Sequence, residues 1–176
     1  MEKLKTGEVS SVEVCAQYID RIKKFEKDVK AWAHFDKKEL LEKASEADDY
    51  RKSGKPLGAL HGLPVAVKDI IGTLDMPTEC GTIIRKKMTG SQEAEVVNLL
   101  KIAGAIIMGK TETTELAYFH PGKTTNPHDY SRTPGGSSSG SAAAIAAHMA
   151  PLSLGSQTNG SIIRLSSYFW LVGVQP

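Results

Sequence analysis

Hydrophobic residues recur at helical spacing through the first third of the chain. A Ser-Ser-Val-Glu sequence at residues 10–13 forms a capping-box pattern, and apolar positions then follow it every three or four residues. These features predict a helix over residues 11–27, and the same spacing predicts a second helix over residues 37–52. Residues 31–35 between them are expected to be extended.

Further along the chain, short apolar runs alternate with helical patterns. Expected strands cover residues 64–69, 105–108 and 152–155, and expected helices cover residues 93–103 and 141–149. This alternation is typical of α/β layering. Neither a repeat nor a long linker divides the sequence, so we predict one domain over residues 1–176, with a helical lead-in at 1–56 and a core portion at 57–176.

The composition is that of a globular chain. It contains 40% hydrophobic and 24% charged residues, and its net charge of +2 is spread over both signs, which argues against a nucleic-acid partner. The longest run of small and apolar residues, 142–150, is far shorter than the ~20 residues that a membrane span needs. Two cysteines and a polar first segment indicate neither a disulfide scaffold nor a secretion signal, so a cytoplasmic location is expected.

Two sequence patterns suggest ligand-binding sites, but the surrounding sequence argues against both. Residues 104–111 match the phosphate-loop pattern of a glycine, four residues and Gly-Lys-Thr, but a helix is expected before them and their middle residues form an apolar strand. The five histidines have no spacing that would collect a metal ion. We therefore expect no phosphate site, no metal and no other cofactor.

Three features could act together in acyl transfer. Lys68 ends a β-branched run: a buried amine there would have a lowered pKa and could accept a proton, whereas many strand-end lysines extend into water without a chemical role. Two turns rich in glycine and serine, residues 135–141 and 157–161, supply hydroxyls and N–H groups. Each turn alone is also compatible with an ordinary loop, but the three together favour a serine-lysine site.

Residues 62–69, 135–141 and 157–164, taken in order, closely resemble the amidase signature family. The similarity continues through shorter matches at residues 76–78, 109–111 and 125–127. The resemblance implies an α/β fold with a mixed sheet flanked by helices. It also implies a small-molecule amide as the substrate, with no cofactor and no membrane partner.

In that family a strand lysine, a serine in a cis peptide bond and a second serine form the catalytic triad. The resemblance implies that Lys68 is the base, Ser137 the proton relay and Ser161 the nucleophile that forms an acyl-enzyme. The oxyanion hole would consist of the N–H groups of Thr158, Asn159, Gly160 and Ser161. Supporting hydrogen bonds are expected from Ser138 and Ser139.

Arg164 belongs to a Ser-Ile-Ile-Arg sequence that resembles a malonamidase-like branch of the family. An arginine at this position of that branch reads a substrate carboxylate, for which the guanidinium fork is suited. The alternative is a structural ion pair that steadies the loop. The sequence leaves both interpretations open.

The chain departs from the family pattern at two positions and in length. Leu165 and Trp170 stand where the family has proline and glycine, and bulk at a glycine position is expected to overpack the fold or clash with the backbone, at a cost of ~1–3 kcal/mol. Family members are also considerably longer. The chain therefore resembles an amino-terminal part, truncated just after the nucleophile motif, as in a gene fragment, a shortened chain or a decayed copy.

The activity expected from the resemblance is hydrolysis of a small carboxamide to a carboxylic acid and ammonia. One alternative is the glutaminase subunit of a tRNA-dependent amidotransferase, which carries the same motifs and passes ammonia to a partner protein. Another is an inactive truncated fragment, or a non-catalytic protein that needs a homodimer or a partner chain to cover its sheet. The Ser-Ile-Ile-Arg form and the loop at residues 120–122 favour the free-standing amidase.

Overall fold

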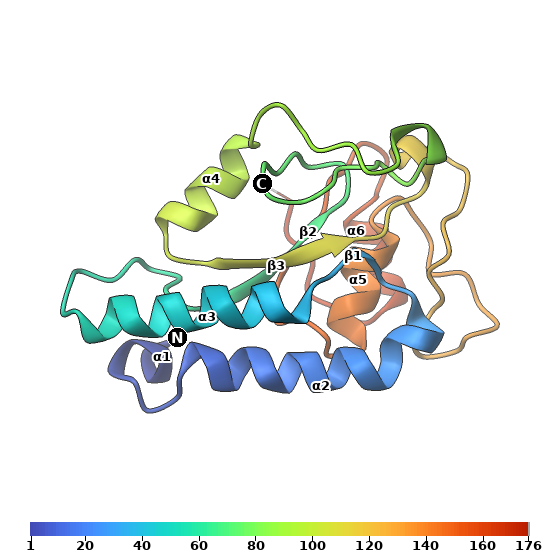
Figure 1. Ribbon diagram of the computed structural model, residues 1–176. Helices are drawn as coiled ribbons and strands as arrows, with labels where there is room; N and C mark the ends of the chain where they lie inside the picture. Colours follow the sequence, from blue (N-terminus) through green and yellow to red (C-terminus); the bar gives the residue numbers. More distant parts are fainter. Residues whose placement is uncertain (176) are drawn as a thin grey trace.

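A mixed four-stranded sheet organises the computed structural model, which describes residues 1–175 (Figure 1). The strands lie in the order β1-β3-β2-β4, with β2 parallel to both β3 and β4 and with β1 antiparallel to β3. Their bounds are Trp32–His34 for β1, Pro64–Lys68 for β2, Ile106–Thr111 for β3 and Ser153–Leu154 for β4. The predicted α/β class with a mixed sheet is confirmed.

Six helices and two short 3-10 turns surround the sheet in the described residues. The helices are α1 Glu2–Thr6, α2 Ser11–Val29, α3 Lys37–Lys52, α4 Glu95–Ile102, α5 Ser139–Ala146 and α6 Ile163–Tyr168, and the 3-10 turns are η1 Ile83–Arg85 and η2 Glu115–Ala117. All four helices expected from the sequence are present; α3 has the predicted bounds, and α2, α4 and α5 have shifted ends. The short α1 and α6 were not expected, because five or six residues give little periodicity to detect.

The predicted capping box at the start of α2 is confirmed. The Ser10 hydroxyl accepts a hydrogen bond from the Glu13 N–H at 3.1 Å, and the Glu13 carboxylate accepts one from the Ser10 N–H at 2.8 Å. Four apolar positions of the helix, Cys15, Ile19, Ile22 and Val29, are buried. The helix thus extends two residues beyond its predicted end, because Val29 still packs in the core.

Side chains of the central strands alternate between two hydrophobic cores. Ile106 and Met108 pack with α2, α3 and α5 on one side of the sheet, where α2 and α3 run next to each other (Figure 1). Ile107 and Val67 pack with Val97 of α4 on the other side. Because both faces are covered, every residue of β2 and β3 is buried, including two lysines.

Lys110 is one of these lysines, and it lies within β3 rather than in a loop. Its ammonium donates hydrogen bonds to the Thr78 hydroxyl at 2.7 Å and to the Pro77 carbonyl at 3.1 Å, and it lies 3.5 Å from the carboxylate of the buried Asp69. Residues 106–111 of the phosphate-loop match form a strand, which the sequence predicted over residues 105–108, and the lysine of this strand is already paired.

The two family departures have different surroundings. Leu165 is buried in the core, so its bulk is accommodated there. Trp170 is 83% exposed, and its ring lies 4.7 Å from that of His128. The expected overpacking at Trp170 is thus absent, and the cost falls on the backbone, whose φ of 55° is one that glycine adopts readily and tryptophan does not.

We predict that Lys110→Met destabilises the protein by about 3 kcal/mol, because it leaves the buried Asp69 carboxylate without its cation. Urea unfolding measures the loss, and adding Asp69→Asn to the variant should recover part of it. The control is Lys27→Met on the exposed face of α2, which should cost no more than about 0.5 kcal/mol. Equal losses at the two lysines would contradict a structural role for the pair.

Candidate active site

Lys68 occupies the carboxyl end of the central strand β2 and is fully buried. Its amine lies 2.7 Å from the Ser137 hydroxyl and 2.8 Å from the Ser156 hydroxyl. The two serines come from different connections: Ser137 immediately precedes the N-cap residue of α5, and Ser156 follows the edge strand β4. The sheet therefore brings one lysine and two hydroxyls together in the interior.

Burial lowers the pKa of the Lys68 amine to about 8. Among residues 1–175, no carboxylate forms an ion pair with this amine, in contrast to Lys110, whose charge is balanced by Asp69. An amine with such a pKa is partly neutral near physiological pH and can then accept a proton from an alcohol.

The backbone around Ser137 is held by the residues that follow β3. The Ser137 carbonyl accepts hydrogen bonds from the Thr114 N–H at 3.1 Å and from the Thr113 hydroxyl at 3.2 Å. The peptide bond between Gly136 and Ser137 is cis. Held in this way, the Ser137 side chain points toward β2, where it meets Lys68.

Ser138 and Ser139 differ in what they contact. The Ser138 hydroxyl donates to the Ser156 carbonyl at 3.1 Å and accepts from the Ser156 N–H at 3.3 Å, so it holds the backbone of a residue that touches Lys68. The Ser139 hydroxyl is buried and has no hydrogen-bond partner in the part of the chain that the structure describes. Of the two, only Ser138 thus has a hydrogen bond that supports the cluster.

Ser161 lines the same cavity as Ser137, a space of about 430 Å³. Within residues 1–175 its hydroxyl makes no hydrogen bond to Ser137 or Lys68. The structure thus joins two of the three predicted catalytic side chains directly and puts the third on the wall of the same cavity. Catalytic hydrogen bonds are often longer or unformed before a substrate binds.

The turn that carries Ser161 is stabilised by Gln157. The Gln157 side-chain oxygen accepts hydrogen bonds from the N–H groups of Ile162 and Ile163, both at 2.9 Å. By contrast, the backbone N–H groups of residues 158–161 find no acceptor within the described chain. These four donors are therefore available to solvent or to a ligand, and Thr158, Asn159 and Ser161 line the cavity.

Arg164 also lines this cavity, and its side chain is exposed. Its guanidinium donates a hydrogen bond to the Asn159 carbonyl at 2.7 Å, and it pairs with no carboxylate of the described residues. The arginine therefore steadies the turn through a carbonyl rather than through an ion pair, and it is one of the residues that line the cavity.

Ser156 is the site residue that the sequence analysis missed. The parallel pairing of Val67 with Leu154 brings the end of β4 alongside the end of β2, so the residue two positions after Leu154 comes next to Lys68. A small polar residue directly after a short apolar run was the only signal in the sequence, and it cannot be interpreted without the strand order.

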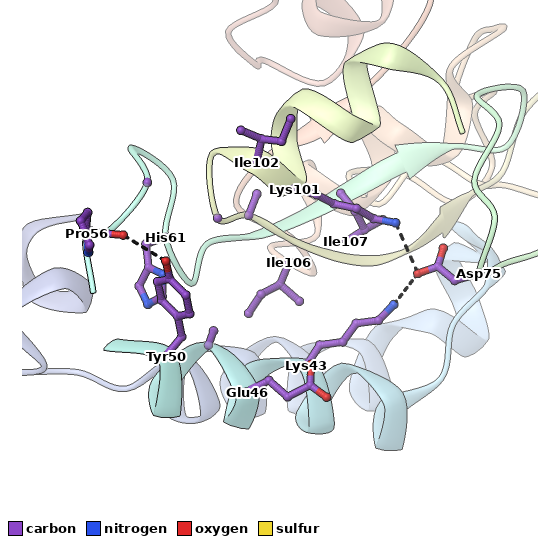
Figure 2. Close-up of a pocket in the computed structure, with 14 residues that line it drawn as sticks. Lys43, Glu46, Tyr50, Pro56, His61, Asp75, Lys101, Ile102, Ile106 and Ile107 are labelled. Carbon is purple, nitrogen blue, oxygen red and sulfur yellow. Dashed lines mark hydrogen bonds and ion pairs between the residues drawn. The ribbon is translucent and has the colours of Figure 1, made fainter. Parts of the chain in front are cut away.

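A second cavity, of about 510 Å³, lies at another part of the fold between α3, α4 and β3 (Figure 2). There Asp75 accepts from Lys43 at 2.8 Å and lies 3.8 Å from the Lys101 ammonium, which ties the two helices together. None of the predicted catalytic residues lines this cavity. Two of the three predicted catalytic residues, Ser137 and Ser161, line the 430 Å³ cavity instead.

Metal-binding clusters and long apolar helices are both lacking in residues 1–175. No group of three or more His, Cys, Asp or Glu side chains there could hold a metal ion. None of the helices within that range is both long and apolar enough to cross a membrane.

Comparisons with known proteins find relatives in sequence and in structure. A protein-family model described as Amidase matches residues 13–176. A glutamyl-tRNA(Gln) amidotransferase subunit of Salinispora tropica is 42% identical over 97% of the chain. The chain spans 36% of that relative's length.

Solved structures share the fold as well as the sequence. A chain from a vestigial protein complex related to an s-triazine catabolic enzyme has a TM-score of 0.86 and 37% identity, covering 94% of this chain and 38% of that one. The native peptide amidase of Stenotrophomonas maltophilia has a TM-score of 0.86 and 32% identity, covering 94% of this chain and 36% of the peptide amidase. These structures therefore share both the fold and a recognisable part of the sequence with this chain.

We predict that the unusual pKa of Lys68 makes the protein more stable as the pH rises. An unfolded lysine titrates near ~10.4, so between about pH 8 and that value the unfolded chain binds more protons than the folded one, and folding becomes more favourable with increasing pH. Relative to Lys68→Met, the wild-type free energy of unfolding should rise by about 3 kcal/mol between pH 7 and pH 10.5.

Urea unfolding of the two proteins across this pH range measures the effect. Taking the difference cancels the titration of other groups, and Lys27→Met is the control for loss of an exposed lysine. A difference between wild type and Lys68→Met that stays constant with pH would contradict a depressed pKa at Lys68.

Proposed function

The chain belongs to the amidase family, and we propose that it carries the groups that hydrolyse a small carboxamide to a carboxylic acid and ammonia. The observation that supports this proposal most directly is the 2.7 Å contact between the Lys68 amine and the Ser137 hydroxyl, beside a cavity that Ser161 lines. With a pKa of about 8, about a tenth of the amine is neutral at pH 7.

The first half of the reaction forms an acyl-enzyme. Neutral Lys68 takes the proton of the Ser137 hydroxyl as Ser137 takes that of Ser161, and the Ser161 oxygen attacks the carbonyl carbon. The N–H groups of residues 158–161 stabilise the oxyanion, and each such donor is worth about 3 kcal/mol in comparable hydrolases. The C–N bond then breaks, and the relay returns the proton to the departing nitrogen, which leaves as ammonia.

The second half restores the enzyme. A water molecule loses a proton to the same relay and attacks the acyl carbon, and the bond to the Ser161 oxygen breaks with return of its proton. The two hydroxyls share no hydrogen bond in the described structure, so the relay requires Ser137 and Ser161 to come within hydrogen-bond distance when substrate binds. Arg164, at the cavity rim, is suited to a carboxylate on the substrate.

Glutamine is a second candidate substrate, since it too is a primary carboxamide. The observation that favours it is the 42% identity to the glutamyl-tRNA(Gln) amidotransferase subunit of Salinispora tropica. In that case the ammonia would pass to a partner protein. Ammonia release from malonamate, glutamine and simple aryl amides distinguishes the free-standing amidase from the glutaminase.

A non-catalytic, partner-dependent protein is the remaining alternative. Size-exclusion chromatography and circular dichroism address it directly. A monomer that melts cooperatively argues against a chain that needs a partner in order to fold.

We predict that a fluorophosphonate labels Ser161, because its oxygen attacks phosphorus as it would a carbonyl, with fluoride leaving and the proton passing to the relay. Ser161→Ala, Ser137→Ala and Lys68→Ala should each lower the labelling rate by about 10³-fold or more. Mass spectrometry of the digested protein locates the adduct, and Ser167→Ala, an exposed serine outside the cavity, is the control. A folded sample without an adduct at Ser161 would remove the proposal of catalysis for this chain.

Ser156 is predicted to act as a positioning residue for Lys68. Its hydroxyl oxygen stabilises the ammonium form, so Ser156→Ala should move the pH midpoint of labelling below about 8 and lower the plateau rate by about tenfold. Ser156→Thr, which keeps the hydroxyl, should restore both quantities. A purely structural role would instead reduce stability and leave the midpoint unchanged.

A further inference from the structure

The cavity that holds Ser137 and Ser161 has two unlike walls. One wall is polar and includes Thr158, Asn159 and Arg164. The other is formed by the segment of residues 117–121, whose lining side chains are those of an alanine, a tyrosine, a phenylalanine and a proline. At about 430 Å³ the space is within the range of small-molecule pockets, roughly 300–1,000 Å³.

Tyr118 and Phe119 dominate the apolar wall. Their ring centroids are 4.4 Å apart with the planes inclined at 53°, and the residues are 72% and 80% exposed. Two adjacent aromatic rings in water are unfavourable on their own and gain free energy when an apolar group covers them. Their position on the cavity wall means that such a group would lie close to Ser161.

The aromatic segment is fixed to the serine turn by hydrogen bonds. The Thr114 N–H donates to the Ser137 carbonyl at 3.1 Å, and the Thr114 hydroxyl donates to the Tyr118 carbonyl at 2.7 Å. One residue thus links the backbone of Ser137 with that of Tyr118. The backbone that carries the two aromatic residues is therefore tied to the serine turn through Thr114.

Leu116 and Ala117 give the segment an uncommon backbone. Both have positive φ, 51° and 57°, which side-chain-bearing residues rarely adopt. Their N–H groups are nevertheless paired, with the carbonyls of Cys80 and Thr114. A strained turn that its surroundings hold in place is a recurrent feature of ligand sites, and here it directs Tyr118 and Phe119 outward to the cavity.

Hydrolysis of a primary carboxamide releases ammonia, so the acyl side is the only organic part of the substrate. Resting on the function proposed above, we infer that Tyr118 and Phe119 bind this acyl group and select carboxamides that carry an aryl or similarly broad apolar substituent. Arg164 lines the same cavity and remains available for a carboxylate elsewhere on the acyl group, as in the function proposed above. The two aromatic residues are thus specificity determinants of the same cavity.

Binding can be measured without catalysis. We expect 4-phenylbutanamide to bind about tenfold more tightly than butanamide, and to shift the NMR signals of residues 114–121, because the phenyl group covers the two rings. Tyr118→Ala and Phe119→Ala should each lower this ratio by about threefold. Equal affinities for the two amides, or shifts confined to other segments, would overturn the aryl subsite and would indicate that another chain segment or a partner covers the rings.

A matched control and a reactivity assay separate this inference from the proposed function. Tyr130→Ala removes a 50% exposed tyrosine that does not line the cavity, and it should keep the wild-type ratio. Fluorophosphonates that differ only in a methyl or a phenylethyl substituent on phosphorus should label Ser161 at rates that differ by about tenfold. Labelling at equal rates overturns the subsite while the catalytic proposal stands. Tight aryl binding without any labelling supports the subsite and overturns the catalytic proposal.

Discussion

A buried amine with hydroxyl partners and no paired carboxylate is the constraint on which the candidate site depends. Lys68 has left water completely, and the nearby oxygen atoms of Ser137 and Ser156 accept its hydrogen bonds without neutralising its charge. The unfavourable burial of the ammonium is what lowers the pKa to about 8. The protein thus gives up stability near neutral pH in order to hold a base in its interior.

Lys68 and Lys110 illustrate how environment decides the role of a lysine. They lie on neighbouring strands, both fully buried, and burial lowers the pKa of each. Asp69 counteracts this effect at Lys110, where hydroxyl and carbonyl oxygens complete a structural ion pair. Lys68 meets two alcohols that could exchange protons, so only this lysine is suited to act as a base.

Much of the fold could be predicted from local signals, and the missing parts have physical reasons. The capping box, the apolar periodicity of α2 and the β-branched run of β2 act locally, so the sequence reveals them. β3 runs on to Thr111 because pairing with strands on both sides outweighs the low strand propensity of Gly109 and Lys110, so the predicted strand ends too early. Residues 139 and 140, expected in a turn, instead begin α5.

The candidate site likewise contains residues that the sequence could reveal and one that depends on the tertiary structure. Motif order was enough to single out Lys68 and Ser137, which the structure brings into contact, whereas Ser156 became visible only through the register of β4 against β2. The overpacking expected at Trp170 is not observed, because the Trp170 ring lies in solvent. The positive φ of Trp170 shows instead that a glycine suits this position because of the backbone conformation there and not because space is short.

The edge strand β4 has a kinetic consequence for this cluster. It is two residues long and lies at the border of the sheet, and short peripheral segments open locally far more often than the whole domain unfolds. Ser156 lies two residues beyond this strand, so each transient detachment of the border removes one of the two alcohols from Lys68 and admits water to the amine. Because the Ser138 hydroxyl also holds Ser156 by two hydrogen bonds, an opening that frees Ser156 must break these bonds as well as the β4 pairing, but it does not require the protein to unfold globally.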